Sequence, residues 1–548
     1  MAGACFALVV AVTVTPAAGG SPAIAQQASS PTTVTSDAVL AWGDNYYGQL
    51  GDGTTNNNRT TPNPVGLPTG AELAAVAAGD AHSLALTSAG TVLAWGRNRV
   101  GQLGDGSTIN RSTPVDVRLP PGITVTAVAA GFNHSLALTS AGTVLAWGDN
   151  SVGQLGDGTR TNRSTPVAVS FPAGTVITAV AGGGVHSLAL TSAGTVFAWG
   201  DNSSGQLGDG STTNRSTPVA VGLPPGTVVA AVAGGGSHSL AVTSAGAARA
   251  WGNNFVGQLG DGSNLNRNAS VPVRLPPGTT VTAIAGGLNH SLAVTSVGTV
   301  LAWGSNSWGQ LGDGTTRERN TPGSVSLPAD STITAVAAGN LFGLAITSAG
   351  AVLAWGSNIL GQLGDGTTTV RRTPVAASLP TATTVTAIAI ATGSVHSLAL
   401  VEARSASTTA LRVSPRNPTA DQDVTLTATV TCTTDTPTGS VTFRSNATDL
   451  ATVPLGGTNT ATHTTGLPPG THTLTAHYAS TNTCPNSRSE ATTITIDTPT
   501  DPDTPTDPDL PITGPNVSSA VGAASLLILT GVTLIHLTHR RRPPHQRP

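Results

Sequence analysis

The stretch AWGDNSVGQLGDG, residues 146–158, decides the fold because close copies of it occur seven times in the chain. GQLGDG begins at Gly48, Gly101, Gly153, Gly205, Gly257, Gly309 and Gly361, and each copy follows the last after 52 or 53 residues. A period this strict indicates one supersecondary unit per repeat, either stacked in a row or closed into a ring. The sequence around each copy must show which.

One unit, read from Pro166 to Gly200, consists of four short segments that alternate apolar and polar residues between turns. TPVAVSFP, VITAVAG, HSLALT and TVFAWG are the expected strands, separated by AGT, GGVH and TSAG. Glycine-rich turns between alternating segments are typical of antiparallel strands, and no helical period is present. Four such strands predict one propeller blade, and seven copies predict a seven-bladed β-propeller.

The two ends of the repeat region predict how the ring closes. The first copy enters at residues 38–43, AVLAWG, with no preceding strand, and the last stops at residues 396–401, HSLALV, with no following strand. In the other copies these two strands form a hairpin, so we expect Ser397 to Leu400 to pair with Val39 to Trp42. An open solenoid is the alternative, and it would leave two unpaired sheet edges.

The motif AWGxNxxGQLGDG, followed by TPV, AVAxG and HSLAL, resembles the regulator-of-chromosome-condensation repeat over residues 38–402. The resemblance implies a seven-bladed propeller. Members of that family have diverse roles, which include guanine-nucleotide exchange and inhibition of β-lactamases by protein contact. A shared fold therefore does not settle the function.

Two side chains that recur along the repeats could be mistaken for metal-binding or catalytic residues. The Asp of each GDG gives one carboxylate per loop, too few for calcium, and an ion pair with the Arg that follows, such as Arg163, is the simpler interpretation. The histidine of each HSLAL lies once per blade, and the sixth copy has Phe342 instead, which favours packing over metal binding. We therefore predict scaffold in both cases, with no metal and no cofactor.

The positions that do not repeat are the better candidates for recognition. If successive strands alternate in direction, the GxxH turns and the NxxG loops lie on one face of the ring. The chain contains only 8 Trp, 3 Tyr and 7 Phe, and several of these lie in or beside those turns. Exposed aromatic residues on a rigid scaffold are typical binding anchors, although packing between blades is the alternative. The predicted binding face comprises Tyr46, Tyr47, Arg99, Phe132, Phe255, Trp308 and Phe342.

Residues 411–497 have a different pattern, with alternating segments such as VTLTATVTC and THTLTAHY between Gly, Pro and Asn turns. This pattern predicts an immunoglobulin-like β-sandwich and resembles the bacterial immunoglobulin-like domains of surface proteins. Cys432 and Cys484 are the even pair of cysteines in this region. In an exported protein they predict one disulfide.

The two ends of the chain carry expected targeting signals. Residues 1–25 are the expected secretory signal peptide, because the chain is apolar from Ala4 to Val14 apart from Thr13 and Ala23-Ile24-Ala25 offers a cleavage site, although no basic residue precedes Arg59. At the other end, Leu510, Pro511, Ile512, Thr513 and Gly514 stand before an apolar stretch and Arg540 to Arg542. This order, within residues 510–548, resembles the LPxTG sorting signal of Gram-positive surface proteins, with a C-terminal transmembrane helix in the precursor. The resemblance implies sortase and peptidoglycan as partners, and a plain membrane anchor is the alternative. Residues 498–509 form an extended Pro/Thr/Asp spacer.

Composition narrows the functional classes. Only 9% of residues are charged and the net charge is −3, so a nucleic-acid-binding surface is not expected. No Ser lies in a G-x-S-x-G context and no cysteine is available as a nucleophile, so we expect no enzyme. The sequence predicts a secreted, wall-anchored protein whose propeller binds an extracellular protein or glycan. An inhibitor of a secreted enzyme and an enzyme with a site in the channel of the ring remain the alternatives, and nucleotide exchange rests on fold analogy alone.

Overall fold

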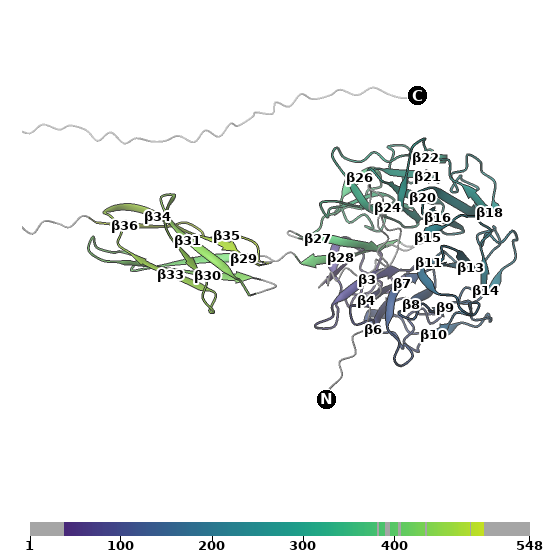
Figure 1. The fold of residues 1–548 in the computed structure, drawn as a ribbon, viewed down its shortest axis with the longest axis horizontal. Coiled ribbons are helices and arrows are strands. Elements are labelled where there is room, and N and C mark those ends of the chain that lie inside the picture. The colour runs from purple at the N-terminus through teal and green to yellow at the C-terminus, as the bar shows by residue number, and fades with distance from the viewer. Residues whose placement is uncertain are drawn as a thin grey trace, which may run out of the picture.

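The computed structural model describes residues 38–497, except for 381–382, 390–394, 404–406, 433–435 and 483. Every regular element in these ranges is a β-strand, which confirms the all-β class (Figure 1). In the described ranges no helix has the length and apolar character that crossing a membrane requires. The expected signal peptide, spacer, sorting motif and transmembrane helix all lie outside the described residues.

Seven four-stranded antiparallel sheets form the predicted blades around a central axis (Figure 1). We number them from the blade that contains both ends of the ring, which is blade 1. The first strands of blades 2 to 7 lie innermost, where neighbouring ones contact each other: β3 (Leu73–Ala78), β7 (Val125–Ala130), β11 (Ile177–Gly182), β15 (Val229–Gly234), β19 (Val281–Gly286) and β23 (Ile333–Ala338). The second strands are β4 (His82–Thr87), β8 (His134–Thr139), β12 (His186–Thr191), β16 (His238–Thr243), β20 (His290–Thr295) and β24 (Phe342–Thr347).

The third strands contain the AWG motif: β5 (Val92–Gly96), β9 (Val144–Gly148), β13 (Val196–Gly200), β17 (Ala248–Gly252), β21 (Val300–Gly304) and β25 (Val352–Gly356). The outer strands each begin at an arginine: β6 (Arg111–Asp116), β10 (Arg163–Ala168), β14 (Arg215–Ala220), β18 (Arg267–Pro272), β22 (Arg319–Ser324) and β26 (Arg371–Ala376). The expected outer strand of one unit began at Thr165 and ran to Pro172. It starts earlier, because Arg163 already pairs with Gly148 of β9.

Blade 1 closes the ring as the chain ends predicted. It contains β27 (Thr383–Ala389), β28 (His396–Ala403), β1 (Ala38–Gly43) and β2 (Arg59–Pro64). β1 pairs antiparallel with β28, with Val39 opposite Leu400 and Trp42 opposite Ser397, so the expected register is confirmed. β28 also contacts β3, and β27 contacts β23, so blade 1 joins blades 2 and 7. The open solenoid is therefore wrong.

The hydrophobic core of the propeller lies between blades. Each of the seven repeated tryptophans is completely buried and belongs to a cluster that two neighbouring blades share. Trp251 of blade 5, for example, packs with Leu190, Val196 and Leu207 of blade 4. Removing a large aromatic side chain and several leucines from water at each joint is the dominant favourable term holding blade to blade.

The residues after the propeller form the expected sandwich. One sheet contains β29 (Ser407–Ser414), β30 (Val424–Cys432) and β33 (Thr460–Thr465). The other contains β32 (Thr448–Pro454), β31 (Gly439–Ser445), β34 (Gly470–Ser480), β35 (Ser487–Arg488) and β36 (Thr492–Ile496). Alternate residues of both sheets, including Leu426, Phe443 and Leu474, fill one buried core.

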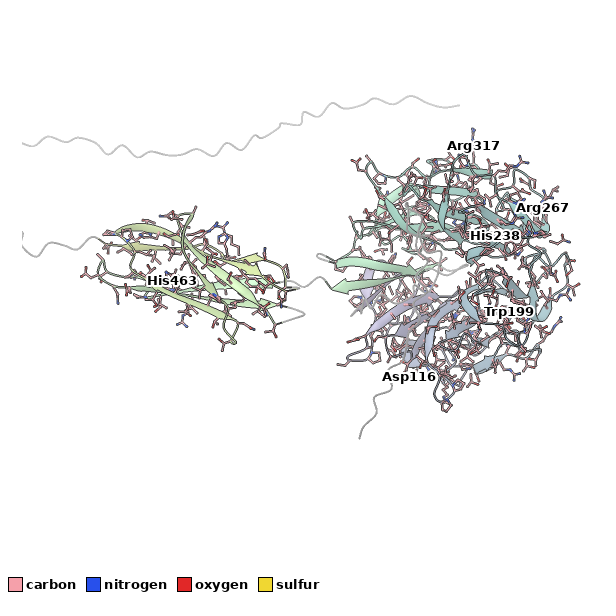
Figure 2. All side chains as sticks on the ribbon, in the orientation of Figure 1. Asp116, Trp199, His238, Arg267, Arg317 and His463 are labelled. Atoms are coloured by element: carbon pink, nitrogen blue, oxygen red, sulfur yellow. A yellow bond between two sulfur atoms is a disulfide. The ribbon has the colours of Figure 1, made fainter. Side chains whose placement is uncertain are left out.

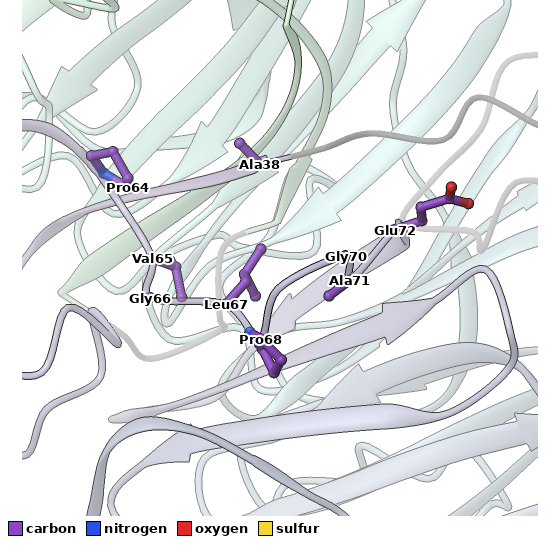
Figure 3. Close-up of a pocket in the computed structure, with 9 residues that line it drawn as sticks. All are labelled: Ala38, Pro64, Val65, Gly66, Leu67, Pro68, Gly70, Ala71 and Glu72. Atoms are coloured by element: carbon purple, nitrogen blue, oxygen red, sulfur yellow. The ribbon is translucent and has the colours of Figure 1, made fainter. Parts of the chain in front are cut away.

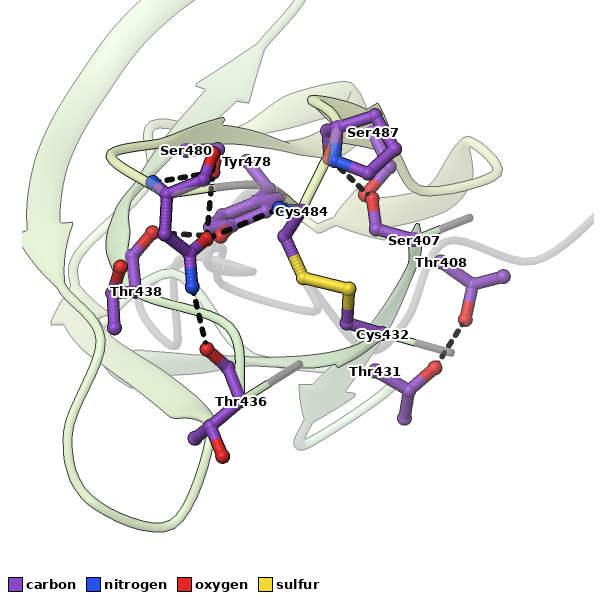
Figure 4. Close-up of a disulfide and its surroundings, with 12 residues drawn as sticks. Ser407, Thr408, Thr431, Cys432, Thr436, Thr438, Tyr478, Ser480, Cys484 and Ser487 are labelled. Atoms are coloured by element: carbon purple, nitrogen blue, oxygen red, sulfur yellow. Dashed lines mark hydrogen bonds between the residues drawn. A yellow bond between two sulfur atoms is a disulfide. The ribbon is translucent and has the colours of Figure 1, made fainter. Parts of the chain in front are cut away.

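The predicted disulfide joins the two sheets of the sandwich (Figure 4). Cys432 ends β30 of one sheet, and Cys484 lies between β34 and β35 of the other, 52 residues later. Closing a loop of this length restricts the unfolded chain substantially. The disulfide prediction is therefore confirmed, and the bond supports the sandwich alone.

A cavity of about 580 Å³ lies at blade 1 (Figure 3). It is lined by Ala38 at the start of β1 and by residues between Pro64 and Glu72. In later blades the corresponding place is covered by the TSAG turn of the preceding blade, where Val125 N donates to Gly90 O and Ile177 N to Gly142 O. Blade 1 has no such hairpin turn, because its two central strands come from opposite ends of the ring. The cavity is thus a consequence of closure.

Candidate functional site

The GQLG part of each loop fastens one blade to the next. The main-chain oxygen of Gln154 in blade 3 accepts hydrogen bonds from Trp199 Nε1 and Ser187 Oγ of blade 4, both at 2.9 Å. The same pair of bonds recurs at Gln49, Gln102 and Gln206. A Cβ added to Gly156 would lie 2.8 Å from Trp199 Nε1, so the loop can approach the indole only where glycine stands. The repeated loop is scaffold.

The aspartate of GDG is saturated by its own loop. Asp157 Oδ1 accepts from Asn150 Nδ2, Thr159 N and Thr159 Oγ1, while Oδ2 accepts from Nε and a terminal nitrogen of Arg163 at 3.0 and 2.8 Å. Burial by itself would raise the pKa of Asp157, but the hydrogen bonds from Thr159 and Arg163 outweigh it and lower the pKa. The expected ion pair is confirmed. The carboxylate oxygens of Asp157 are thus occupied in closing the loop.

The repeated histidines link neighbouring blades in a nearly continuous ring. In five of the six histidines, Nε2 lies 2.9 to 3.0 Å from the Oγ of the serine that directly follows the equivalent histidine of the next blade: His82 to Ser135, His134 to Ser187, His186 to Ser239, His238 to Ser291 and His396 to Ser83. That serine already donates to a Gln carbonyl, so it accepts from Nε2–H, which assigns the neutral Nε2–H tautomer. The prediction of a structural role is confirmed.

Complete burial keeps these histidines neutral. Desolvation lowers the pKa of His134, His186 and His290 to about 4, and that of His82, His238 and His396 to about 3. At neutral pH their charge is therefore zero. The rings act as packed hydrogen-bond donors.

Blade 7 interrupts this ring, and it corrects one predicted site residue. Phe342 is fully buried, with its ring over Gly339 where the other blades place the histidine over a glycine. Its assignment to the binding face is wrong, because the residue points into the blade interface and no part of it meets solvent. The next residue is Gly343 instead of serine, so His290 of blade 6 loses its partner, and its Nε2 makes no hydrogen bond within the described residues.

The two variable turns lie on one face, as expected. The residue after AWG donates its backbone N–H to the residue before the histidine, as Arg97 does to Ala81 O and Asp149 to Asn133 O, both at 2.8 Å. The NxxG loops and GxxH turns therefore meet at the same end of each blade. We call this end of the ring the variable face.

Exposed apolar residues on the variable face form an arc over four consecutive blades. Phe255 of blade 5 is 70% exposed, Trp308 of blade 6 is 37%, Ile359 of blade 7 is 53% and Tyr46 of blade 1 is 60%. Tyr46, Phe255 and Ile359 directly follow the Asn of the NxxG loop, and Trp308 stands one position later. The loops of blades 2, 3 and 4 carry Arg99, Ser151 and Ser203 directly after that Asn. The arc is continuous only because blade 7 adjoins blade 1. We call these four residues the apolar arc.

Ile359 was missed by the search for aromatic residues, although it occupies the same slot as Tyr46 and Phe255. The signal was its position, one residue after the Asn of the NxxG loop. Large exposed apolar groups gathered on one face of a protein are uncommon and mark interaction sites. Ile359 therefore joins the candidate face.

Two more of the predicted residues, Tyr47 and Arg99, lie beside the apolar arc. Tyr46 and Tyr47 meet edge to face with ring centroids 4.8 Å apart, and the guanidinium carbons of Arg97 and Arg99 lie 5.3 and 6.0 Å from the Tyr47 centroid. These distances place both cations within reach of the ring face. The structure thus brings Tyr46, Tyr47 and Arg99 together, and it adds Arg97.

Phe132 lies on the same face but closer to the axis. It is half-buried, and a Cβ on Gly184 of the next blade would touch its ring at 2.8 Å. Its carbonyl accepts from Asp80 N, and its N–H donates to Gly184 O, so the inner turns are bonded from blade to blade. Phe132 covers the turn of a neighbour and offers only part of its ring to a ligand.

The first strands of blades 2 to 7, which line the channel of the ring, offer few groups for catalysis. The first strands consist of Ala, Val, Ile, Leu, Thr and Gly, with no titratable residue in β3, β7, β11, β15, β19 or β23. General acid–base catalysis needs a positioned titratable group. These strands supply no candidate for the alternative of an enzyme with a site in the channel. The sortase motif, Leu510 to Gly514, lies outside the described residues.

Comparisons with known families agree with this architecture. The regulator of chromosome condensation (RCC1) repeat matches residues 36–86 and 89–138, and the RCC1-like domain matches residues 165–409. The bacterial Ig-like domain (group 3) matches residues 411–497. The two recognised modules therefore coincide with the ring and the sandwich.

Curated relatives extend the match. The mitochondrial RCC1 domain-containing protein RUG3 of Arabidopsis thaliana is 31% identical over 403 residues, which covers 68% of this chain and 90% of RUG3. The ultraviolet-B receptor UVR8 of Arabidopsis thaliana is 37% identical over 284 residues, or 52% of this chain and 64% of UVR8. The human E3 ubiquitin-protein ligase HERC2 is 31% identical over 376 residues, 68% of this chain but only 8% of HERC2.

Among solved structures, Prp20p from Saccharomyces cerevisiae superposes with a TM-score of 0.61 at 27% sequence identity, over 68% of this chain and 92% of that chain. Human WBSCR16 has the same TM-score at 24% identity, over 67% and 99%, and shows the shared fold. One conclusion follows from the strict repeat period, the closed ring and the loops that fasten one blade to the next. It is supported by the relative RUG3, which is matched over 90% of its length. The chain belongs to the family of RCC1-repeat propellers.

Proposed function

We propose that the propeller binds a protein partner through its variable face. The observation that supports the proposal most strongly is the apolar arc, in which Phe255, Trp308, Ile359 and Tyr46 are exposed on adjoining blades of an otherwise repetitive ring. Aromatic residues and arginines are enriched among the residues that dominate binding energy at protein interfaces. The solved relative Prp20p is described with binding properties to Gsp1p and histones, and a complex of Kap60 with Prp20 has been solved.

We also propose that the protein is exported and displayed at the cell wall. Support comes from the sequence: an apolar N-terminal segment, Leu510 to Gly514, an apolar stretch and a terminal Arg cluster in the order of a sorting signal. The disulfide between Cys432 and Cys484 suits an oxidising compartment. The bacterial Ig-like sandwich would then serve as a stalk between the wall and the propeller.

Replacing arc residues is expected to abolish partner capture. With the full chain as bait for surface and secreted proteins, Tyr46→Ala and Trp308→Ala should each weaken capture about ten-fold or more, because each removes a large anchor from the face. Val297→Ala is the matched control, since Val297 is 76% exposed in the turn at the opposite end of blade 6. Capture that survives both aromatic substitutions would exclude the arc, and capture of a glycan instead of a protein would change the partner class.

The anchoring proposal has its own test. Thr513→Ala should abolish covalent linkage to peptidoglycan, because the variant no longer contains the LPxTG motif at whose Thr–Gly bond a sortase would cut. Cell fractionation should then find the protein in the membrane or the medium. Asn516→Ala, just beyond the motif, is the control and should remain wall-linked. Unaltered wall linkage of the Thr513 variant would refute the sorting signal.

A further inference from the structure

Departures from the repeat concentrate where the loop of blade 6 meets blade 7. Trp308 occupies a slot that holds Val100, Val152 and Val256 in other blades, and Arg372 occupies one that holds serine in blades 2, 3 and 4. Arg319 lies 3.8 Å from Asp313, whereas the other blades keep this pair at 2.7 to 2.8 Å. The guanidinium has moved over Gly323, which replaces a larger residue in β22. Because the seven copies are otherwise so similar, these changes single out one joint.

Two exposed arginines, Arg317 and Arg372, belong to the segments that adjoin the turn of Trp308. Asn306 Nδ2 donates to the main-chain oxygen of Arg317 at 3.0 Å, which fixes the backbone of Arg317 beside the residue that opens the Ser307–Trp308 turn. The Cγ of Arg372 lies 2.9 Å from the position of a Cβ on Gly309, so the stem of Arg372 crosses the residue next to Trp308. Arg317 lies at the rim of the ring in Figure 2. We call Trp308, Arg317 and Arg372 the first aromatic–arginine cluster.

The second aromatic–arginine cluster is the group of Tyr47, Arg97 and Arg99 at the joint of blades 1 and 2. Ile359 of blade 7 lies between the two clusters in the order of the ring. Within the part of the chain that the structure describes, Arg99, Arg317 and Arg372 have no ion-pair partner, and Arg97 makes one with Asp80 at 3.7 Å. The face therefore presents apolar anchors interleaved with four arginines, which outnumber the three carboxylates of the same turns, Asp44, Asp80 and Glu318.

In blades 3 and 4 the aspartates of this face outnumber the exposed arginine of the same loops that has no ion pair within the described residues, Arg160. The position after AWG is Asp44 in blade 1, Asp149 in blade 3 and Asp201 in blade 4, but Asn253, Ser305 and Ser357 in blades 5, 6 and 7. An acidic ligand would thus be attracted to blades 5 to 7 and the joint with blade 2, and repelled from blades 3 and 4. Aromatic-lined surfaces also recognise the preformed polyproline II helix, whose proline rings pack on exposed indole and phenol groups.

The chain itself contains a segment with both properties. Residues 498–509, TPTDPDTPTDPD, place proline at every third position, at Pro499, Pro502, Pro505 and Pro508. A polyproline II helix has three residues per turn, so these prolines would form one ridge, with four aspartates on the other edges. The acidic side chains of this spacer complement the arginines of the variable face, and its prolines complement the exposed aromatic rings.

Geometry favours the spacer of another copy over the chain's own. The sandwich begins at Ser407 with β29, and Asp497 at its other end bridges Thr419, beyond the far end of that strand. The chain thus leaves the sandwich opposite its point of entry, about 26 Å away for a strand of 8 residues. Twelve residues of polyproline II span about 37 Å. Returning alongside the sandwich would leave roughly 10 Å for crossing the face of the propeller.

We propose that the two aromatic–arginine clusters and Ile359 bind the acidic proline-rich spacer, residues 498–509, of a second copy of this chain. The prolines pack on Trp308 of the first cluster, on Ile359 and on Tyr46, whose ring meets that of Tyr47 in the second cluster. The aspartates pair with Arg99, Arg317 and Arg372. Such a contact is heterologous, since the surface on one copy differs from the surface on the other, and it links copies head to tail. This inference rests on the proposed function and names its partner.

Binding of a labelled peptide tests the proposal. A fluorescein-labelled peptide with the sequence of residues 497–509 is titrated with the full chain in detergent, and anisotropy is recorded at low and physiological salt. Saturable binding is expected, weaker at higher salt. Trp308→Val and Arg372→Ser, which restore what other blades contain, should each weaken it about ten-fold. Val297→Ser on the opposite face should leave it unchanged, and unchanged thermal unfolding checks that each variant is folded.

The peptide itself provides two further controls. Asn in place of every Asp removes the charge and should lose the binding and its salt dependence, whereas Ala in place of every Pro keeps the charge and should still lose most of the affinity. Absence of saturation by the native peptide, or equal affinity in the Trp308→Val and wild-type chains, overturns the inference. If the peptide fails while partner capture still depends on Trp308, the proposed function stands and only this partner is wrong.

Discussion

Lowering the pH from 7.5 to 5 is expected to unfold the propeller, because six histidines are buried in the neutral form. Each has a pKa of about 3 or 4 in the folded ring and an ordinary value near 6.5 in the unfolded chain. Between pH 6.5 and about 4 the unfolded chain therefore binds more protons, and the free energy of unfolding falls as the pH falls. Above pH 6.5 both states are neutral and the effect vanishes.

The expected magnitude is large because the six sites act together. Each proton bound only on unfolding changes stability by about 1.4 kcal/mol per pH unit, so six change it by about 8 kcal/mol per unit near pH 5. Summed from neutral pH to pH 5, the loss is on the order of 10 kcal/mol, which is comparable to the whole stability of a typical domain. The His–Ser bonds that join the blades should fail cooperatively.

Tryptophan fluorescence measures this transition selectively, since all 8 tryptophans lie in the propeller. Denaturant unfolding at several pH values gives the number of protons taken up, and we expect about six. His238→Phe is the matched variant, because Phe342 already occupies the equivalent position over Gly339. It should reduce the uptake by one proton. Stability that stays constant from pH 7 to 5 would contradict the buried neutral assignment.

Within one GQLGDG loop, two glycine substitutions are expected to differ sharply. Gly153 has φ of +91°, and its Cβ would lie 2.6 Å from the Cα of Ser216 in the next blade. Gly158 has φ of +81°, and the nearest atom to its Cβ is a methyl group at 3.9 Å. Gly158→Ala should cost about 1–2 kcal/mol for the left-handed backbone alone. Gly153→Ala adds a clash with backbone and should cost about 3–5 kcal/mol.

Chemical denaturation followed by tryptophan fluorescence compares the two variants with the wild-type chain. The contrast between them isolates the steric term, because both residues share the loop and the sign of φ. Equal losses of stability would show that the first glycine is required for its backbone conformation and not for the approach of the neighbouring blade. The close approach of Ser216 would then not be what requires glycine at position 153.

Much of the fold could be predicted because its determinants are local. Alternation of apolar residues, turn glycines and the strict period act within a few residues of one another, and they indicate the strands, the blades and the number of copies. The register of Val39 with Leu400 also followed, since the same two segments form a hairpin in every internal copy. Pairing of Asp157 with Arg163 is similarly local, six residues apart.

The candidate site was only partly predictable. Tyr46, Phe255 and Trp308 were identified as exposed aromatics, but Phe342 was assigned to the face although it is buried in place of a histidine. A turn signal locates a residue at one end of a strand and leaves open the direction of its side chain. Arg97 and Arg372 could not be identified from the sequence because the residues that they contact lie on other blades.

The sequence by itself determined the architecture: seven equivalent blades, a closed ring and a separate sandwich, because each repeat encodes the same short-range pairing. Tertiary structure decided which residues lie side by side around the ring. Residues from different blades make up the His–Ser bonds and the apolar arc. The series of bonds is interrupted where Phe342 and Gly343 replace the histidine and the serine. The alignment of these residues depends on how each blade packs against the next, and ring closure alone places the blade of Ile359 next to the blade of Tyr46.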